Sequence, residues 1–375
     1  MASFDDNFYN DMQKTLDKMM KEWYNKGVLA REDTQEERMD KSMTPREEMQ
    51  KAYENFNKSV PTISRYSRCL NLLYLKGQLD PCYHRDNLLV SMQKILLRKN
   101  KANVLLTGAA GCGKTAIAEG LAGIITERRV AYQEEWNKLH KEFSKAHKAW
   151  KRQCAKIDED GEYVVDYPAE PQWIDPPKPH LASCVIYDLS LNALVGGTKY
   201  RGEFEERLQE VLDECKKNPN IILFIDEIHQ IGKVGASDGS EGASQILKPA
   251  LARNDIKVIG ATTTEEKAYI TKDKALARRF CEVEVAQLVG APAVETADKI
   301  LADYCKYHKV NTDVSATDIL AKVQFFLPKS VFPDNIINVI DETLAGAVFD
   351  GLKAVDMSHF NAVLSRMTGK IIMGG

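Results

Sequence analysis

The stretch that decides the fold is Gly108-Ala109-Ala110-Gly111-Cys112-Gly113-Lys114-Thr115, which matches the pattern G-x-x-x-x-G-K-[ST]. An apolar run of buried-strand type at 102–107 precedes it, and Ala, Ile and Leu recur at helical spacing over 115–125. Strand, glycine-rich loop and helix therefore follow in the order that a phosphate-binding loop requires. The glycines let backbone N–H groups surround phosphate oxygens, which the positive end of the helix also attracts.

Lys114 and Thr115 complete the predicted site. The lysine is placed to reach the β- and γ-phosphate oxygens, and the threonine hydroxyl is placed to ligate Mg²⁺. The sequence thus predicts a site for a nucleoside triphosphate such as ATP, with Mg²⁺ as a second cofactor.

Strands and helices alternate over 63–286, which predicts an α/β fold with a parallel sheet covered by helices on both faces. Further strands are expected at 183–188, 221–226, 256–261 and 281–286. The second of them ends in Asp226 and Glu227, and a parallel strand delivers its carboxyl end to the ligand crevice. We therefore expect Asp226 to hold Mg²⁺ through water. Glu227 is expected to polarise the attacking water as a general base, a role worth about 10²–10⁴ in rate.

Composition excludes several other classes of protein. The chain has 375 residues and a formal net charge of −3, so bulk charge implies neither nucleic acid nor membrane as a partner. Its eight cysteines form no C-x-x-C pair, which argues against a zinc site and a disulfide framework. No apolar run approaches the roughly 20 residues of a membrane span. The amino terminus, M-A-S-F-D-D, lacks a secretory signal, so a cytoplasmic location is expected.

The pattern divides the chain into three parts. Residues 1–62 are polar with helical apolar spacing, and a helix is predicted to start at Pro45 after the capping box of Thr44 and Glu47. Residues 63–290 form the predicted large α/β domain, and 291–375 a small α-helical domain. Its helices are expected at 294–307, 313–326, 333–350 and 357–367.

A long excursion at 131–181 interrupts the large domain. Its first half predicts an amphipathic helix with one stripe formed by Trp136, Leu139, His140, Phe143, Ala146, His147 and Trp150. Its second half is rich in proline and is expected to be extended or loop-like. An insertion of this size is typically functional or an interface.

Residue chemistry alone does not determine the roles of two further motifs. Thr263 follows the strand at 256–261, where a hydroxyl can orient water against the γ-phosphate. Arg278 and Arg279 precede the strand at 281–286. This pair is either a solvated face or an arginine finger, which neutralises charge on the phosphoryl group in a neighbouring subunit.

Several segments together resemble the first ATPase module of the Clp-type AAA+ unfoldases, ClpA, ClpB and ClpC. The resemblance runs from about residue 66 to the carboxyl terminus, interrupted by the 131–181 excursion. The segments that carry it are G-Q-L-D-P-C-Y-H-R at 77–85, the phosphate loop, L-V-G-G-T-K-Y-R-G-E-F-E-E-R-L at 194–208, I-L-F-I-D-E-I-H at 222–229, L-K-P-A-L-A-R at 247–253, I-G-A-T-T at 259–263 and A-L-A-R-R-F at 275–280.

The resemblance implies an AAA+ fold in which a small helical lid follows the parallel sheet. It implies nucleotide contacts at Gly108 to Thr115, a sensor role for Thr263, and trans-acting fingers at Arg278 and Arg279. It also implies a pore loop in which Tyr200, flanked by Lys199 and Arg201, grips a polypeptide. An aromatic ring suits sequence-blind gripping because it packs on any backbone or side chain.

This chain departs from the family pattern in several places. The family's globular amino-terminal domain is replaced by short helices, and no coiled-coil middle domain is expected. No I-G-[FL] tripeptide appears, so a ClpP-type protease partner is not expected. The family's P-D-K-A-I-D stretch reads P-D-N-I-I-N at 333–338, and Tyr83-His84 replaces a small apolar residue and a glycine near the adenine pocket.

The resulting expectation is an ATP-hydrolysing single ring, a homo-oligomer and specifically a hexamer, that unfolds or remodels protein by threading it through a central pore. Two alternatives stay open: an assembly or scaffold ring driven by ATP, and a nucleic-acid motor or loader. A nucleic-acid partner is not favoured, because the only basic candidates are Arg128-Arg129 and 148–152.

Overall fold

The computed structural model describes residues 43–159, 169–196, 201–233, 242–253 and 255–372. The chain divides into two compact units, 1–51 and 52–375. The helices predicted ahead of residue 43 lie outside the described residues. Helix α3 (Pro45–Ser59) begins at the predicted proline. Its capping box is confirmed, because Glu47 accepts a 2.7 Å hydrogen bond from the Thr44 N–H and its own N–H donates to Thr44 Oγ1 at 3.4 Å.

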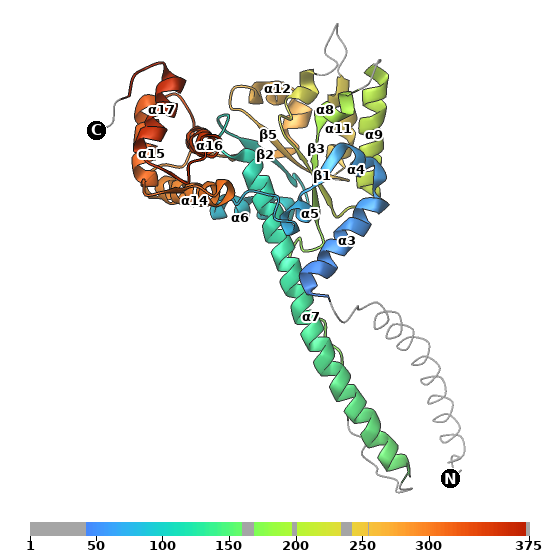
Figure 1. Ribbon diagram of the computed structural model, residues 1–375. Helices are drawn as coiled ribbons and strands as arrows, with labels where there is room; N and C mark the ends of the chain where they lie inside the picture. The colour runs from blue at the N-terminus through green and yellow to red at the C-terminus, as the bar shows by residue number, and fades with distance from the viewer. Residues whose placement is uncertain (1–42, 160–168, 197–200, 234–241, 254, 373–375) are drawn as a thin grey trace, which may run out of the picture. The chain divides into compact units, whose positions relative to one another are not determined.

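A six-stranded sheet forms the centre of the second unit (Figure 1). In spatial order its strands are β1 (Ser67–Cys69), β3 (Val185–Leu189), β4 (Ile221–Ile225), β5 (Lys257–Thr262), β2 (Asn103–Thr107) and β6 (Phe280–Glu284). All neighbours pair in parallel except β1 and β3. The prediction of an α/β fold with a parallel sheet is confirmed. The antiparallel strand β1 was not predicted, because three residues are too few to show a period of two.

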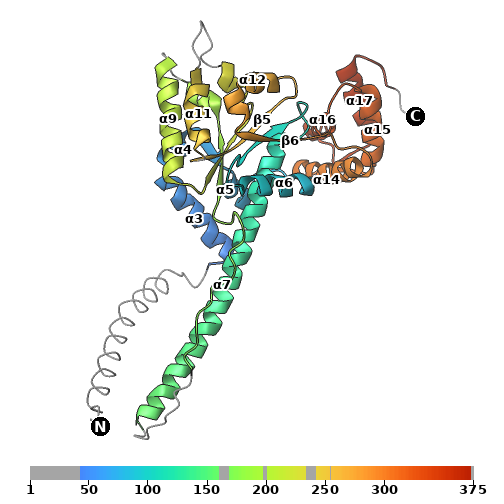
Figure 2. The same ribbon diagram turned by 180° about the vertical axis from the view of Figure 1, so that it is seen from behind.

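Two groups of helices pack against the sheet, which lies between them in Figures 1 and 2. One group consists of α5 (Leu70–Leu75), α6 (Asp86–Leu96) and α7 (Lys114–Glu159). The other includes α4 (Pro61–Tyr66), α8 (Leu191–Val195), α9 (Arg201–Lys217), α10 (Gln230–Lys233), α11 (Gly242–Ala252), α12 (Lys267–Thr271) and α13 (Lys274–Ala277). Strands β2 and β4 are buried along their whole length, as expected for a sheet covered on both faces.

Helix α7 differs from the sequence pattern, which suggests separate helices at 115–125 and within 131–181. The structure joins them into one helix of 46 residues. The physical reason is that 124–159 contains neither glycine nor proline, so nothing ends the helix where its contact with the hydrophobic core ends, at Val130.

The aromatic stripe predicted in the excursion is confirmed on α7. The rings of Trp136 and His140 stack at 4.7 Å, and those of Phe143 and His147 at 5.6 Å. Trp173, in the irregular return segment 169–179, packs edge-on against Trp136 at 5.7 Å and against Phe143 at 5.5 Å. The projecting part of α7 therefore carries its own small aromatic core.

The carboxyl-terminal region is helical as predicted and has its own hydrophobic core, which includes Ala297, Val323, Ile336 and Phe360. Its helices are α14 (Ala291–His308), α15 (Ala316–Phe326), α16 (Asp334–Phe349) and α17 (Met357–Thr368). Two short strands, β7 (Asn311–Thr312) and β8 (Ala354–Val355), pair in parallel and were not predicted.

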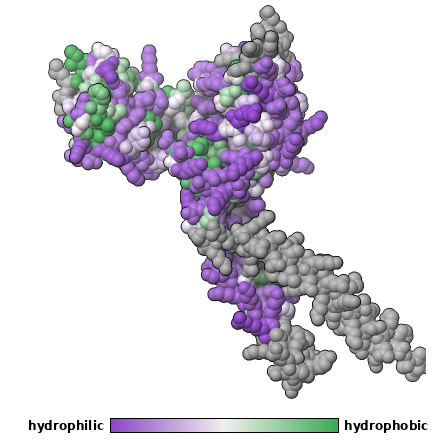
Figure 3. Space-filling model, turned by 45° about the vertical axis from the view of Figure 1, so that its right-hand side comes forward, coloured by the Kyte–Doolittle hydropathy of each residue, from purple (hydrophilic) through white to green (hydrophobic). Residues whose placement is uncertain are grey.

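Most of the surface visible in Figure 3 is hydrophilic, whereas hydrophobic side chains gather on the carboxyl-terminal helical region. Large apolar side chains exposed in that region include Tyr307, Phe325, Phe349 and Ile371. Among the helices that the structure describes, none combines the length and the apolar character needed to cross a bilayer.

Candidate nucleotide-binding site

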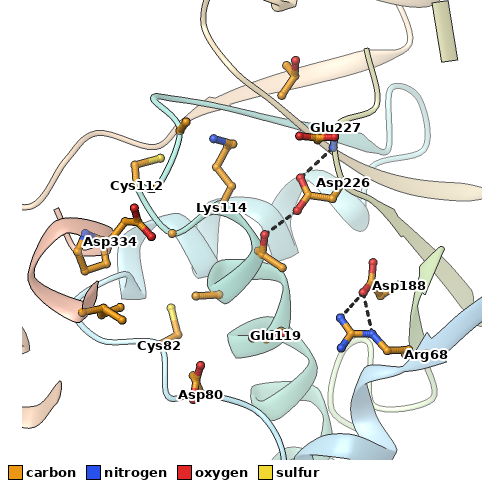
Figure 4. A pocket seen from close by; sticks show the side chains of 18 of the residues that line it. Arg68, Asp80, Cys82, Cys112, Lys114, Glu119, Asp188, Asp226, Glu227 and Asp334 are labelled. Atoms are coloured by element: carbon orange, nitrogen blue, oxygen red, sulfur yellow. Dashed lines mark hydrogen bonds and ion pairs between the residues drawn. The ribbon is translucent and has the colours of Figure 1, made fainter. Parts of the chain in front are cut away.

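A cavity of about 1090 Å³ opens at the carboxyl edge of the sheet. Its walls come from the phosphate loop, the end of β4, the segment 80–85 and the helices α14 and α16. Figure 4 shows the charged and thiol side chains that face it. This volume lies just above the usual range for small-molecule sites, about 300–1,000 Å³.

The phosphate loop has the conformation that its glycines permit. Gly111 and Gly113 have positive φ angles of 77° and 92°, which residues with a Cβ rarely adopt. A Cβ on Gly111 would also meet the Cβ of Asp334 at 2.6 Å. Ala110 to Thr115 line the cavity. Gly108 and Ala109 do not, but their carbonyl oxygens accept hydrogen bonds of 3.0 and 2.9 Å from Lys114 Nζ.

Cys112 is buried within this loop, and burial is the main cause that raises the pKa of its thiol. The thiol is therefore protonated and unreactive near neutral pH. This burial fits a small residue that fills space in the loop.

Thr115 and Asp226 are brought together as predicted, although β4 and α7 are far apart in the sequence. The threonine hydroxyl donates a 2.7 Å hydrogen bond to Asp226 Oδ2 (Figure 4). The other carboxylate oxygen accepts a 2.8 Å hydrogen bond from the Glu227 N–H. A hydroxyl and a carboxylate are hard oxygen ligands of the type that Mg²⁺ prefers. The described residues contain no cluster of three or more His, Cys, Asp or Glu able to hold a metal, so phosphate and water oxygens would supply the remaining ligands.

Glu227 lies on the wall of the same cavity with an exposed side chain. Its backbone has a φ of 48°, an uncommon conformation for a residue with a Cβ. Gln230 Nε2 donates to its carboxylate. Strained backbone of this kind is common at active sites because the fold holds one side chain in a required direction.

Thr263 also lines the cavity, and a partly buried network connects it to the residues that follow β4. Its hydroxyl donates to Glu266 at 2.9 Å, Glu266 pairs with His229 at 3.0 Å, and His229 Nδ1 lies 3.1 Å from Thr262 Oγ1. His229 is only 3% exposed. Sequence reasoning missed His229 and Glu266. Their only sequence signal is that each lies two or three residues after a predicted site residue.

Arg278 and Arg279 do not reach this cavity. Both are exposed at the end of α13, and they line a separate cavity together with Lys101 and Lys248. The structure therefore does not bring the arginines to the phosphate loop of their own chain.

The predicted pore-loop residues Lys199 and Tyr200 lie outside the described residues. Arg201 is the first residue of α9, and its side chain is likewise outside what the structure describes.

A group of charged residues on the cavity wall was not predicted. Arg68 and Asp188 form an ion pair of 2.6 Å, and Asp80 and Glu119 line the same wall (Figure 4). Burial, and secondarily the charge of Asp80, raises the pKa of Glu119 to about 7, whereas Arg68 opposes this shift. Glu119 is therefore protonated in a substantial fraction of molecules at neutral pH.

Glu119→Gln is expected to make the ligand-free protein more stable at pH 8 but not at pH 4.5. The folded-state pKa of about 7 exceeds the ordinary value of 4.5, so the stability gained from the protonated carboxyl is complete below pH 4.5 and is lost as pH rises through 7. Because Glu119 is partly exposed, the gain at pH 8 is on the order of 1 kcal/mol. Chemical unfolding at both pH values measures it, with Glu134→Gln on the exposed part of α7 as control. Equal stability changes at both pH values would contradict the assignment.

Known proteins resemble this chain in sequence. Residues 104–288 match the family model described as "ATPase family associated with various cellular activities (AAA)". The chaperone protein ClpB of Helicobacter hepaticus is 36% identical over 289 residues, covering 76% of this chain and 28% of the relative. The ATP-dependent Clp protease ATP-binding subunit ClpC of Staphylococcus epidermidis is 33% identical over 293 residues, covering 78% of this chain and 30% of the relative.

Solved structures of Hsp104 resemble this chain in fold. The Saccharomyces cerevisiae Hsp104-ADP complex superposes with a TM-score of 0.62 at 30% identity, covering 82% of this chain and 46% of the other. A closed-state reconstruction of Hsp104 with ATPγS and FITC casein has a TM-score of 0.61 at 31% identity, covering 82% and 45%. The chain thus spans less than half the length of each of these proteins.

Proposed function

Because this chain belongs to the AAA ATPases and carries a Clp-type AAA+ module, we propose that it hydrolyses ATP and uses the energy to unfold or remodel protein substrates. The working assembly in this proposal is a single homo-oligomeric ring, a hexamer, through whose central pore the substrate is threaded. Its working parts are the large α/β domain at 63–290 and the small helical domain at 291–375.

The observation that carries the proposal is the convergence of Thr115, Asp226 and Glu227 beside the phosphate loop. The loop N–H groups and Lys114 neutralise phosphate charge, and the exposed Glu227 carboxylate accepts a proton from the attacking water. Thr263, whose hydroxyl donates to Glu266, orients that water in this proposal.

Mg²⁺, held by Thr115 and Asp226 with phosphate and water oxygens, would neutralise charge on the transferring phosphoryl group. The residues of this chain would fix the position of the Mg²⁺ ion beside the phosphates. Asp226 is well suited to this because one oxygen faces Thr115 and the other is fixed by the Glu227 N–H.

Two surface features support an oligomer. Arg278 and Arg279 are exposed and distant from their own phosphate loop, as an arginine finger acting on a neighbouring subunit must be. Exposed apolar side chains gather on the carboxyl-terminal helical region, and patches of this kind commonly mark protein interfaces. The Hsp104 structure with casein is a relative captured with a protein.

The proposed partners follow from the sequence. They are other copies of this chain and an unfolded or partly folded polypeptide. No I-G-[FL] tripeptide occurs in the sequence, so we propose an activity independent of a ClpP-type protease. We also propose a cytoplasmic location for this activity.

Tyr200→Ala tests the threading proposal directly. We expect the variant to keep basal ATPase activity and ring assembly and to lose unfolding of a tagged substrate by at least tenfold, because the aromatic ring provides the grip. Unfolding is followed by loss of substrate fluorescence, and assembly by light scattering.

Tyr200→Phe is the matched control and should unfold substrate at nearly the wild-type rate, because gripping does not need the hydroxyl. Wild-type unfolding by Tyr200→Ala would remove threading and favour an assembly ring. ATPase stimulation by single-stranded nucleic acid but not by unfolded protein would favour a nucleic-acid motor.

A further inference from the structure

The segment 80–85, ahead of the phosphate loop, contacts helix α14 through two adjacent side chains. Tyr83 OH donates a 2.9 Å hydrogen bond to Asp303 Oδ2, and Lys299 Nζ lies 4.7 Å from the centre of the Tyr83 ring. His84 Nε2 lies 3.1 Å from Glu295 Oε2. These residues of α14 are spaced four apart, so they lie along one face of the helix. The two contacts therefore connect the large α/β domain to the helical region at two points.

The Tyr83 hydroxyl keeps its proton and can therefore donate a hydrogen bond at physiological pH. Burial, and then the hydrogen bond to Asp303, raises the pKa of Tyr83 to about 12. The phenol therefore stays protonated over the whole physiological range, and its bond to the carboxylate is charge-assisted.

The backbone is strained at His84, within the turn whose Tyr83 and His84 side chains contact α14. Its φ of 54° is left-handed, a conformation that glycine adopts freely and histidine does not. The next residue, Arg85, is only 8% exposed and donates to Ala286 O at 2.7 Å and to Cys112 O at 3.1 Å. One side of the turn is therefore anchored to the phosphate loop and the other to α14.

The turn also lies on the wall of the nucleotide cavity. Tyr83 and Arg85 line it, as do Thr296, Asp303 and Tyr304 on α14. A change in the distance between the turn and α14 would change the width of the cavity. The hydrogen bond from Arg85 to the Cys112 carbonyl connects this turn to the phosphate loop.

We propose that Tyr83 and His84 form a latch with Asp303 and Glu295 that holds α14 against the cavity, and that this latch sets how tightly nucleotide is retained. The latch rests on the proposed function, because its ligand is the nucleotide of that site. Its members are positioning residues, since they act through α14 and the phosphate loop. Opening it speeds nucleotide release and leaves the hydrolytic residues in place.

The test measures affinity and release of N-methylanthraniloyl-ATP, together with kcat at saturating ATP. Tyr83→Phe keeps the ring and removes the donor. Asp303→Ala removes the acceptor. Each is expected to raise Kd about tenfold, the factor that 1.4 kcal/mol gives. The double variant should match either single one, because both remove the same bond. We expect kcat to change less than twofold.

His84→Gly separates the latch from a merely structural role. Glycine relieves the left-handed strain, so the unfolding midpoint should not fall, whereas nucleotide release should accelerate because the contact with Glu295 is lost. Tyr307→Phe is the matched control on α14, because Tyr307 is 80% exposed and does not line the cavity. It should bind like the wild type.

The latch alone would be overturned by wild-type Kd in both Tyr83→Phe and His84→Gly, or by additive effects in the double variant. Weaker binding accompanied by a lower unfolding midpoint in His84→Gly would also overturn it, since that pattern indicates a structural role. A wild-type protein that binds no nucleotide would overturn the proposed function, and the latch with it.

Discussion

Glu227→Gln is expected to bind ATP with wild-type affinity and to hydrolyse it about 10²–10⁴-fold more slowly. The amide keeps the size and exposure of the side chain but cannot accept the proton of the attacking water. The contact between Thr115 and Asp226 does not involve the Glu227 side chain, so nucleotide binding should be preserved. Phosphate release and binding of a fluorescent ATP analogue measure the two quantities separately.

Lys114→Ala is the contrasting variant, because it removes the cation that faces the phosphate oxygens and should abolish binding itself. Glu265→Gln, an exposed carboxylate that does not line the cavity, should behave like the wild type. The roles given to Lys114 and Glu227 would be contradicted if both variants lost binding to the same extent.

Arg279→Ala is expected to leave ATP affinity nearly unchanged while turnover falls by about 10³–10⁵, as for loss of an arginine finger. The affinity is spared because Arg279 lines a different cavity from the phosphate loop of its own chain. Mixing this variant with Glu227→Gln subunits should restore part of the activity. Some interfaces in the mixture then combine an intact Glu227 from one subunit with an intact Arg279 from the other.

Lys274→Ala provides the matched control, because this exposed lysine begins α13, the short helix that precedes Arg279, and lies outside the second cavity. It should turn over ATP at the wild-type rate. Wild-type hydrolysis by a purified monomer, or a mixture no more active than its parts, would show that the arginines do not act in trans.

The fold could be predicted from the sequence wherever one local pattern determined it. The apolar run at 221–225 and the glycine pattern at 108–115 needed no knowledge of distant residues. The short strand β1 and the pair β7 and β8 depend on partners far along the chain, so no local periodicity reveals them.

The candidate site, too, could be predicted only where a local pattern determined it. Thr115 and Asp226 could be paired in advance, because parallel strands and the phosphate loop share one edge of the sheet. The buried connection from Thr262 through His229 to Glu266 could not, because it depends on how β4 and the turn after β5 pack. The contact of Tyr83 with Asp303 joins residues 220 positions apart. The sequence showed only that Tyr83-His84 departs from the family pattern.

The uninterrupted course of α7 has a mechanical consequence. Its first residues, Lys114 and Thr115, belong to the phosphate loop, and 29 residues of the same helix extend past Val130, a length of about 44 Å. A continuous α-helix is stiff over this length. A tilt of about 5° at the phosphate end, which lies about 68 Å from Glu159 along the helix, would therefore move that residue by roughly 6 Å. The helix would therefore magnify a small rotation at its phosphate end, and the edge-on contacts of Trp173 with Trp136 and Phe143 connect its projecting part to the return segment.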